Sequence, residues 1–168
     1  FGQNVLHDES TWQLVLKTEE ELAGLPDFVR SAAKSAAKER GIEDGFAITL
    51  SRSLVVPFLT FSQRRDLRET AWRAWTTRGE HAGEHDNRPL IAQIVQLRKE
   101  QAQLHGYKTF ADYALVDRMA KEPKAVHQLL DDVWGRAKQK VEHERAQLKA
   151  AQSAEGASGE IEAWDWRY

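Results

Sequence analysis

Cysteine is absent from the 168-residue sequence, which excludes disulfide bonds and thiolate metal ligands within it. An excess of one charge is also absent, because 24 lysines and arginines are balanced by 26 aspartates and glutamates. The chain therefore lacks the excess of positive charge with which proteins bind nucleic acids and anionic membranes. No apolar run reaches the length of a membrane-spanning helix. We expect neither nucleic acid nor a membrane as a partner.

The remaining composition is that of an ordinary soluble domain. Hydrophobic residues make up 41% and charged residues 30% of a chain that is long enough to bury a core. No signal peptide is visible, but little follows from that because the chain begins at Phe1. We expect a cytoplasmic protein, with the periplasm as the alternative.

Helical patterns occupy most of the chain, so the predicted fold class is mainly α. Capping residues, first-turn prolines and apolar periodicity predict where the helices lie. The predicted helices cover residues 1–6, 18–24, 26–40, a short stretch after Pro57, 63–78, 87–104, 110–115 and 123–152. We expect the apolar face of helix 87–104, which includes Leu97, to be buried. Leu130 and Trp134 belong to the apolar stripe of the last helix, and we interpret Trp134 as lying on its inner side.

Two short segments are exceptions to the helical pattern. Residues 12–16 and 46–50 alternate in polarity and carry β-branched and aromatic side chains, which favours strands. We expect them to pair as one two-stranded antiparallel ribbon that depends on packing against helices. No internal repeat or low-complexity tract interrupts the chain, so residues 1–168 are interpreted as a single helical segment.

Two short patterns imitate zinc-binding motifs. The run His81-Ala82-Gly83-Glu84-His85 fits the inverted zincin signature His-x-x-Glu-His. That signature needs a rigid helix, whereas the glycines and polar neighbours here favour a solvated loop. The run His143-Glu144-Arg145-Ala146-Gln147 differs from His-Glu-x-x-His at its last position, and Gln is a poor zinc ligand. We assign no catalytic, cofactor-binding or metal-binding residue and expect no zinc within residues 1–168.

Other chemical signatures are also missing. No phosphate loop, dinucleotide-binding glycine motif or nucleophile elbow is present. The mixed-sign run from Arg64 to Glu69 is interpreted as ion pairs on a helix surface rather than as an anion site. The six tryptophans are interpreted as core anchors. Near the end of the chain, Trp164-Asp165 is interpreted as the start of a helix that Asp165 caps.

Short phrases in a fixed order carry a resemblance to a known family. They are Phe-Gly-Gln-Asn-Val-Leu at 1–6, Ala-Lys-Glu-Arg-Gly at 37–41, Arg-Asp-Leu-Arg-Glu at 65–69, Gly-Tyr at 106–107, Met-Ala-Lys-x-Pro at 119–123 and Trp-Asp at 164–165. Each phrase alone is weak, but the ordered set extends over nearly the whole chain. The sequence resembles the thimet oligopeptidase family of zinc metallopeptidases, most closely its bacterial peptidyl-dipeptidases, with oligopeptidase A next.

The resemblance implies a mostly helical, two-lobed enzyme with a deep channel between the lobes. It implies a zinc ion held by two histidines and a glutamate, with a motif glutamate as general base. It also implies the release of dipeptides from the C-termini of short peptides. None of those functional residues matches a position in this sequence. The resemblance therefore implies a piece of one helical lobe, upstream of the zinc motif and truncated at both ends, whose partners are the rest of the parent chain and short peptides.

The alternative is a non-enzymatic helical interaction module. The beginning at Phe1 and the end at 164–168 look severed, which favours the peptidase piece. Such a piece is expected to expose apolar faces that missing helices would cover, and to self-associate through them. We expect Trp164, Trp166 and one side of the helix from Pro123 to contribute to that exposed surface.

Overall fold

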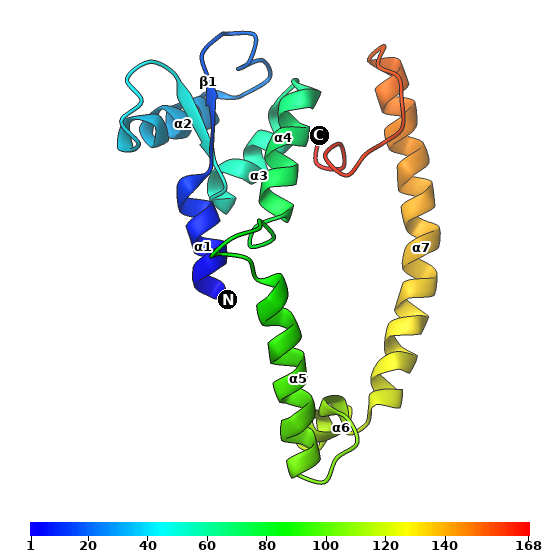
Figure 1. Ribbon diagram of the computed structural model, residues 1–168. Coiled ribbons are helices and arrows are strands. Elements are labelled where there is room, and N and C mark those ends of the chain that lie inside the picture. The colour runs from blue at the N-terminus through cyan, green and yellow to red at the C-terminus, as the bar shows by residue number, and fades with distance from the viewer. The chain divides into compact units, whose positions relative to one another are not determined.

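One two-stranded antiparallel ribbon is present in the computed structural model, which describes residues 1–168 (Figure 1). Strand β1 (Gln13–Leu16) pairs with β2 (Phe46–Thr49). The register sets Leu14 opposite Ile48, so the predicted ribbon is confirmed at the predicted positions. Leu16 and Ile48 are fully buried, and α2 (Asp27–Glu39) packs against β2.

The helices account for most of the remaining chain, so the fold is mainly α as predicted. Besides α2 they are α1 (Gly2–Thr11), α3 (Arg52–Phe61), α4 (Arg65–Thr76), α5 (Arg88–Leu104), α6 (Phe110–Leu115) and α7 (Pro123–Ala154). None of them is both long and apolar enough to cross a membrane. Helix α6 begins with the predicted cap at Thr109, whose hydroxyl accepts a hydrogen bond from the Asp112 amide.

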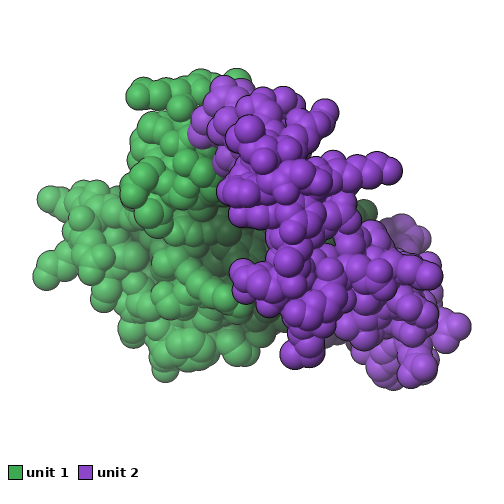
Figure 2. Space-filling model, turned by 90° about the horizontal axis from the view of Figure 1, so that it is seen from below, with its two compact units in different colours: residues 1–88, 161–168 green, residues 89–160 purple.

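The chain divides into two compact units, which Figure 2 distinguishes by colour. Unit 1 contains Phe1–Arg88 and Ile161–Tyr168, and unit 2 contains Pro89–Glu160. Unit 1 has a continuous hydrophobic core, whose buried members are Leu16, Leu22, Leu25, Val29, Ala33, Ile48, Leu54, Val55, Phe58, Leu59 and Ala71. Helices thus cover the apolar side of the ribbon, as a two-stranded ribbon requires for stability.

Helix α3 differs from the prediction, which placed only a short helical stretch after Pro57. The helix begins at Arg52 and keeps Pro57 in its interior. A proline there removes a main-chain hydrogen bond and costs about 3 kcal/mol. Burial of Val55, Phe58 and Leu59 in the core of unit 1 offsets that cost, because each buried large apolar side chain contributes about 1.5–3 kcal/mol.

Helix α1 is longer than predicted. It continues to Thr11 instead of ending near Leu6. In its last turn, the hydroxyls of Ser10 and Thr11 both donate to the main-chain oxygen of His7 at 2.8 Å. These two hydroxyls therefore supply extra donors to one carbonyl of the last turn, that of His7, beyond the predicted end of the helix.

Two predicted helical segments are turns instead. Residues 18–24 form turns, although the predicted capping hydrogen bonds between Thr18 and Glu21 are present. Gly24 ends this segment after a single turn because its φ of +82° does not continue a helix. Residues 163–167 also form turns rather than the start of a helix. The carboxylate of Asp165 accepts a hydrogen bond from the Glu162 amide and also binds side chains of α4, as described below.

Unit 2 buries few of its side chains. Ala102 is its only buried residue, whereas Leu97, Leu130 and Trp134 are 63%, 56% and 63% exposed. The predicted burial of Leu97 and Trp134 is therefore wrong for residues 1–168, whereas the predicted exposure of one apolar side of the helix from Pro123 is confirmed. The reason is geometric, because the six residues of α6 are too few to cover helices of 17 and 32 residues.

Gly24 is expected to tolerate no side chain, because a Cβ atom there would lie 2.2 Å from the main-chain oxygen of Phe61. We expect Gly24→Ala to lower the free energy of unfolding by about 2–4 kcal/mol, from left-handed backbone strain and from displaced main chain. Gly41→Ala is the control, since Gly41 has a φ of +70° but no neighbour within 4 Å of its Cβ position. Its expected cost is about 1 kcal/mol. Equal losses in urea unfolding would contradict this steric explanation.

Candidate functional site

The histidine loop at residues 79–87 packs against α1. The ring of His85 stacks on that of His7 with centroids 3.7 Å apart. His81 Nε2 lies 3.8 Å from Asp8 Oδ2. The two histidines of the zinc-like pattern therefore lie on a largely exposed loop, as predicted, and His81 and His85 also contact α1.

Main-chain and amide hydrogen bonds fix the ends of this loop. The Gly79 amide donates to Asp8 Oδ2 at 2.7 Å, and the Asn87 amide donates to the Gly79 oxygen at 2.7 Å. The buried side chain of Asn87 accepts a hydrogen bond from Asn4 at 3.0 Å. A Cβ atom at Gly79 would lie 2.4 Å from the side-chain nitrogen Nδ2 of Asn87, so only glycine fits there. The polar residues around the histidines thus have structural roles.

The histidine loop does not fit a zinc ion. A catalytic zinc needs about three protein ligands and one open position. No group of three or more histidine, aspartate, glutamate or cysteine side chains in the structure could hold a metal ion. The second zinc-like pattern, at 143–147, lies along α7, where Glu144 forms an ion pair with Lys140 at 3.7 Å. Neither pattern supplies the ligands that the resembled family uses.

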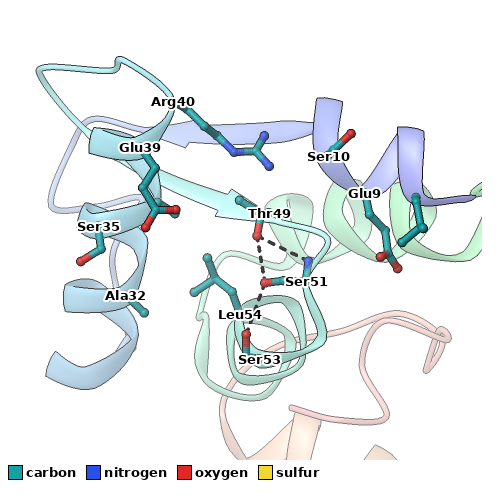
Figure 3. Close-up of a pocket in the computed structure, with 12 residues that line it drawn as sticks. Glu9, Ser10, Ala32, Ser35, Glu39, Arg40, Thr49, Ser51, Ser53 and Leu54 are labelled. Carbon is teal, nitrogen blue, oxygen red and sulfur yellow. Dashed lines mark hydrogen bonds between the residues drawn. The ribbon is translucent and has the colours of Figure 1, made fainter. Parts of the chain in front are cut away.

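A hollow of about 540 Å³ lies in unit 1 beside α1, α2 and the turn between β2 and α3 (Figure 3). A row of hydroxyl groups lines it, with Thr49 and Ser51 oxygens 3.0 Å apart and Ser51 and Ser53 oxygens 3.4 Å apart. The guanidinium of Arg40 also faces the hollow and donates to the main-chain oxygen of Trp12 at 3.0 Å.

The hollow can offer hydrogen bonds to a polar ligand but carries no catalytic constellation. A nucleophilic hydroxyl needs an adjacent base that removes its proton. The hydroxyls of Thr49, Ser51 and Ser53 bond to one another, and no histidine lines the hollow. Arg40 is committed to holding the end of β1. Glu9 and Glu39 also line the hollow, but neither carboxylate forms a hydrogen bond with one of these hydroxyls, so the structure shows no paired nucleophile and base there.

Asp165 joins the last residues of the chain to α4 through two arginines, and we name this group (Asp165, Arg65 and Arg68) the Asp165 anchor. Arg65 donates to both carboxylate oxygens, most closely to Oδ2 at 2.8 Å. Arg68 donates to Oδ1 at 3.0 Å and to the main-chain oxygen of Ser62 at 2.7 Å. Arg68 is only 3% exposed, so this is a buried ion pair that needs all of its hydrogen bonds.

Aromatic rings surround the anchor. The Trp164 ring meets Trp72 edge-on with centroids 5.8 Å apart, and the Arg68 guanidinium lies 4.0 Å from the centre of the Tyr168 ring. Trp164 is therefore buried, and its predicted place in an exposed apolar surface is wrong. Trp166 is 39% exposed, which agrees with that prediction.

Sequence reasoning missed the anchor. It interpreted the run from Arg64 to Glu69 as surface ion pairs, which holds for Arg64 with Asp66 at 2.7 Å but not for the buried Arg68. The only signal was that both partners belong to the ordered phrases quoted above. No local pattern pairs positions 97 residues apart.

Burial and hydrogen bonding act in opposite directions on the pKa of Asp165. Burial raises the pKa, but hydrogen bonds from Arg65, the Glu162 amide and Arg68 outweigh it and leave the pKa below its ordinary value. A carboxylate with a depressed folded pKa contributes stability above its unfolded pKa, near 3.9, and loses it as the pH falls through the folded pKa.

We therefore expect the free energy of unfolding to decrease as the pH falls below about 4. The decrease in the free energy of unfolding should be smaller in Asp165→Asn, because this variant has no carboxylate to protonate at position 165. Urea unfolding of both proteins between pH 3 and pH 7 measures the difference. The same pH dependence in both would show that Asp165 contributes nothing to acid sensitivity.

Comparison with known proteins shows which family this sequence matches. The model of peptidase family M3 matches residues 58–168, which include α4 and the Asp165 anchor. Over its whole length the chain is 36% identical to oligopeptidase A of Salmonella typhimurium and covers 25% of that protein. It is 30% identical over its whole length to dipeptidyl carboxypeptidase of the same organism, again covering 25%. It is also 30% identical, over 98% of its length, to probable cytosolic oligopeptidase A of Arabidopsis thaliana, covering 24%.

The chain thus spans about a quarter of the length of the curated relatives it matches. Its identity to oligopeptidase A is higher than that to dipeptidyl carboxypeptidase, whereas the short phrases had placed the peptidyl-dipeptidases first. The resemblance to this group of metallopeptidases is confirmed at the level of the family. Because the family model covers well over half of the sequence, the chain belongs to peptidase family M3.

Proposed function

We propose that this chain is a non-catalytic helical segment of a longer, zinc-dependent peptidase that hydrolyses short peptides. The observation that carries the proposal is the 36% identity to an oligopeptidase A along the entire chain. Because residues 1–168 contain no side-chain group fit for a metal, the zinc ligands and general base are expected in the remaining part of the longer protein. We keep the cytoplasm as the predicted compartment.

The segment's own contribution is structural. Unit 1 offers a packed core and a buried ion pair, both of which hold helices in fixed positions. A peptidase needs such rigid elements because catalytic groups must be positioned to within about 0.5 Å. Within the longer protein, we propose that this segment forms part of one lobe beside the substrate channel.

The finer proposal is that the longer protein releases dipeptides from the C-termini of its substrates. The ordered phrases and the similarity to a dipeptidyl carboxypeptidase support it, while the higher identity to oligopeptidase A favours an oligopeptidase. These two specificities differ in one requirement, since a dipeptide-releasing enzyme needs a free C-terminal carboxylate on its substrate.

A paired-substrate assay tests both levels of the proposal. The zinc-loaded longer protein is incubated with a peptide of about ten residues, either with a free C-terminus or amidated, and the products are identified by mass spectrometry. We expect hydrolysis that a chelator abolishes and zinc restores. Loss of cleavage on amidation supports dipeptide release, and cleavage of both peptides at an internal bond supports the oligopeptidase. No metal-dependent cleavage of either peptide would contradict the proposed function.

The second candidate, a helical interaction module, is favoured by one observation. The 32-residue helix α7 has no buried residue, which is unusual unless another surface covers it. An inactive longer protein that binds a partner through α7 would support this candidate instead.

A further inference from the structure

Unit 2 has no hydrophobic core of its own. Ala102 is its only buried residue, and neither α6 nor α7 contains any. Helices in proteins are stabilised mainly by packing of an apolar face rather than by intrinsic propensity. The apolar side chains of unit 2 therefore require a covering surface that its own residues do not provide.

The exposed apolar side chains of α7 lie on one face. At 100° per residue, their spacing of one, three, four and seven residues confines them to a single stripe along the helix. We name these residues the α7 stripe: Leu129, Leu130, Val133, Trp134 and Val141, which are between 43% and 66% exposed. The half-buried Val126 and Ala137 continue the same face.

The opposite face of α7 carries polar or small residues. It carries Gln128, Gly135, Gln139 and Glu142, all of them exposed. A separation of apolar and polar residues onto opposite faces is typical of a helix that buries one face. The separation indicates that the stripe packs against an apolar surface while the opposite face remains in solvent.

We propose that the α7 stripe packs against a further helix of the same longer protein, outside residues 1–168. This inference rests on the part of the proposed function that makes the chain a segment of a longer protein. The relatives that match along the whole chain are about four times its length, so most of each relative lies outside the matched segment. A tethered helix also meets the stripe at an effective concentration in the millimolar range, an advantage that a separate molecule lacks.

The geometry of the stripe fits a helix as the covering element. A helix of 32 residues is about 48 Å long at 1.5 Å per residue. Side chains spaced three and four residues apart form the ridges that a second helix accepts in its grooves at about 8–10 Å between axes. The stripe of α7 offers such ridges from position 129 to position 141.

Cysteine labelling of the longer protein tests the inference, because residues 1–168 contain no cysteine of their own. Leu129→Cys and Val133→Cys place a thiol on the stripe, and Gln128→Cys and Gln139→Cys place matched thiols on the opposite face. The unsubstituted protein gives the background rate. We expect maleimide to react with the stripe thiols on the order of a hundredfold more slowly than with the control thiols, because a buried group reacts only after local opening. Denaturant should equalise the rates.

Oxidative footprinting of the unsubstituted protein gives an independent reading that does not depend on any variant folding. Trp134 is expected to be oxidised at least about tenfold more slowly in the folded longer protein than in denaturant. Equal labelling rates of stripe and control thiols in the folded protein would overturn the inference. Equal oxidation rates of Trp134 in the folded protein and in denaturant would overturn it as well.

Other occupants of the stripe give different results. Protection that disappears on dilution, together with a dimer that dissociates in sedimentation, would overturn the inference and assign the stripe to a second copy. Slow labelling of the stripe thiols in residues 1–168 alone would also overturn the inference. A peptidase assay on the same preparations separates the two proposals, since an inactive protein with a protected stripe contradicts only the proposed catalysis.

Discussion

Replacing Asp165 with alanine is expected to lower the free energy of unfolding of unit 1 by about 3–5 kcal/mol, the cost of removing one partner from a buried ion pair. Without Asp165, the 3%-exposed Arg68 would keep only the main-chain oxygens of Ser62 and Trp164 as hydrogen-bond acceptors, beside the Tyr168 ring. Its positive charge would remain buried and uncompensated. Urea unfolding followed by circular dichroism measures the loss.

Asp66→Ala is the matched control. Asp66 also pairs with an arginine of the same region, Arg64, at 2.7 Å, but its side chain is 61% exposed. Exposed pairs of this kind contribute at most about 1 kcal/mol. If both alanine variants lost the same stability, the anchor would be no more than another surface ion pair.

The second large effect is expected for Phe58→Ala in α3. Phe58 is fully buried in the core of unit 1, and its truncation should cost about 3–5 kcal/mol through lost burial and the cavity left behind. Phe61, one turn further along the same helix, is 41% exposed and meets Phe28 edge-on. Phe61→Ala is therefore expected to cost about 1 kcal/mol, mainly for the lost aromatic pair.

The comparison of these two variants also tests why α3 tolerates Pro57. If core burial offsets the proline, Phe58→Ala should reduce helix content as well as stability, and Phe61→Ala should leave helix content unchanged. Equal stability losses in the two variants would show that burial in the core does not decide the stability of α3.

Local patterns were sufficient for much of the fold. The alternation at 12–16 and 46–50 predicted the ribbon because a half-buried strand has a period of two. The proline at 123 and the cap at Thr109 marked the starts of α7 and α6, since both signals act within a single turn.

Features that depend on distant residues could not be predicted in the same way. Pro57 suggested that a helix could begin only after it, because the burial that offsets the proline comes from other elements. The partner of Arg68 lies 97 residues away, which no local period encodes. The stripe on α7 was recognised, but an apolar period shows that a face needs covering and not which element covers it.

For the candidate site, the sequence predicted the kind of structure that carries His81 and His85. The glycines around His81 and His85 correctly indicated a loop, but not its contacts with α1, where His7 stacks on His85. Those contacts explain the residues without any metal. We therefore propose that the catalytic residues lie outside this segment.

Our proposal is that residues 1–168 supply structure rather than chemistry to a longer peptidase. Its most direct test is to measure bound zinc and peptide hydrolysis in the purified 168-residue chain after saturation with zinc, beside the variant His81→Ala/His85→Ala. We predict no stoichiometric zinc and no hydrolysis in either protein, because no three ligands converge. One zinc per chain, with a metal-dependent peptidase activity that the double variant loses, would contradict this proposal.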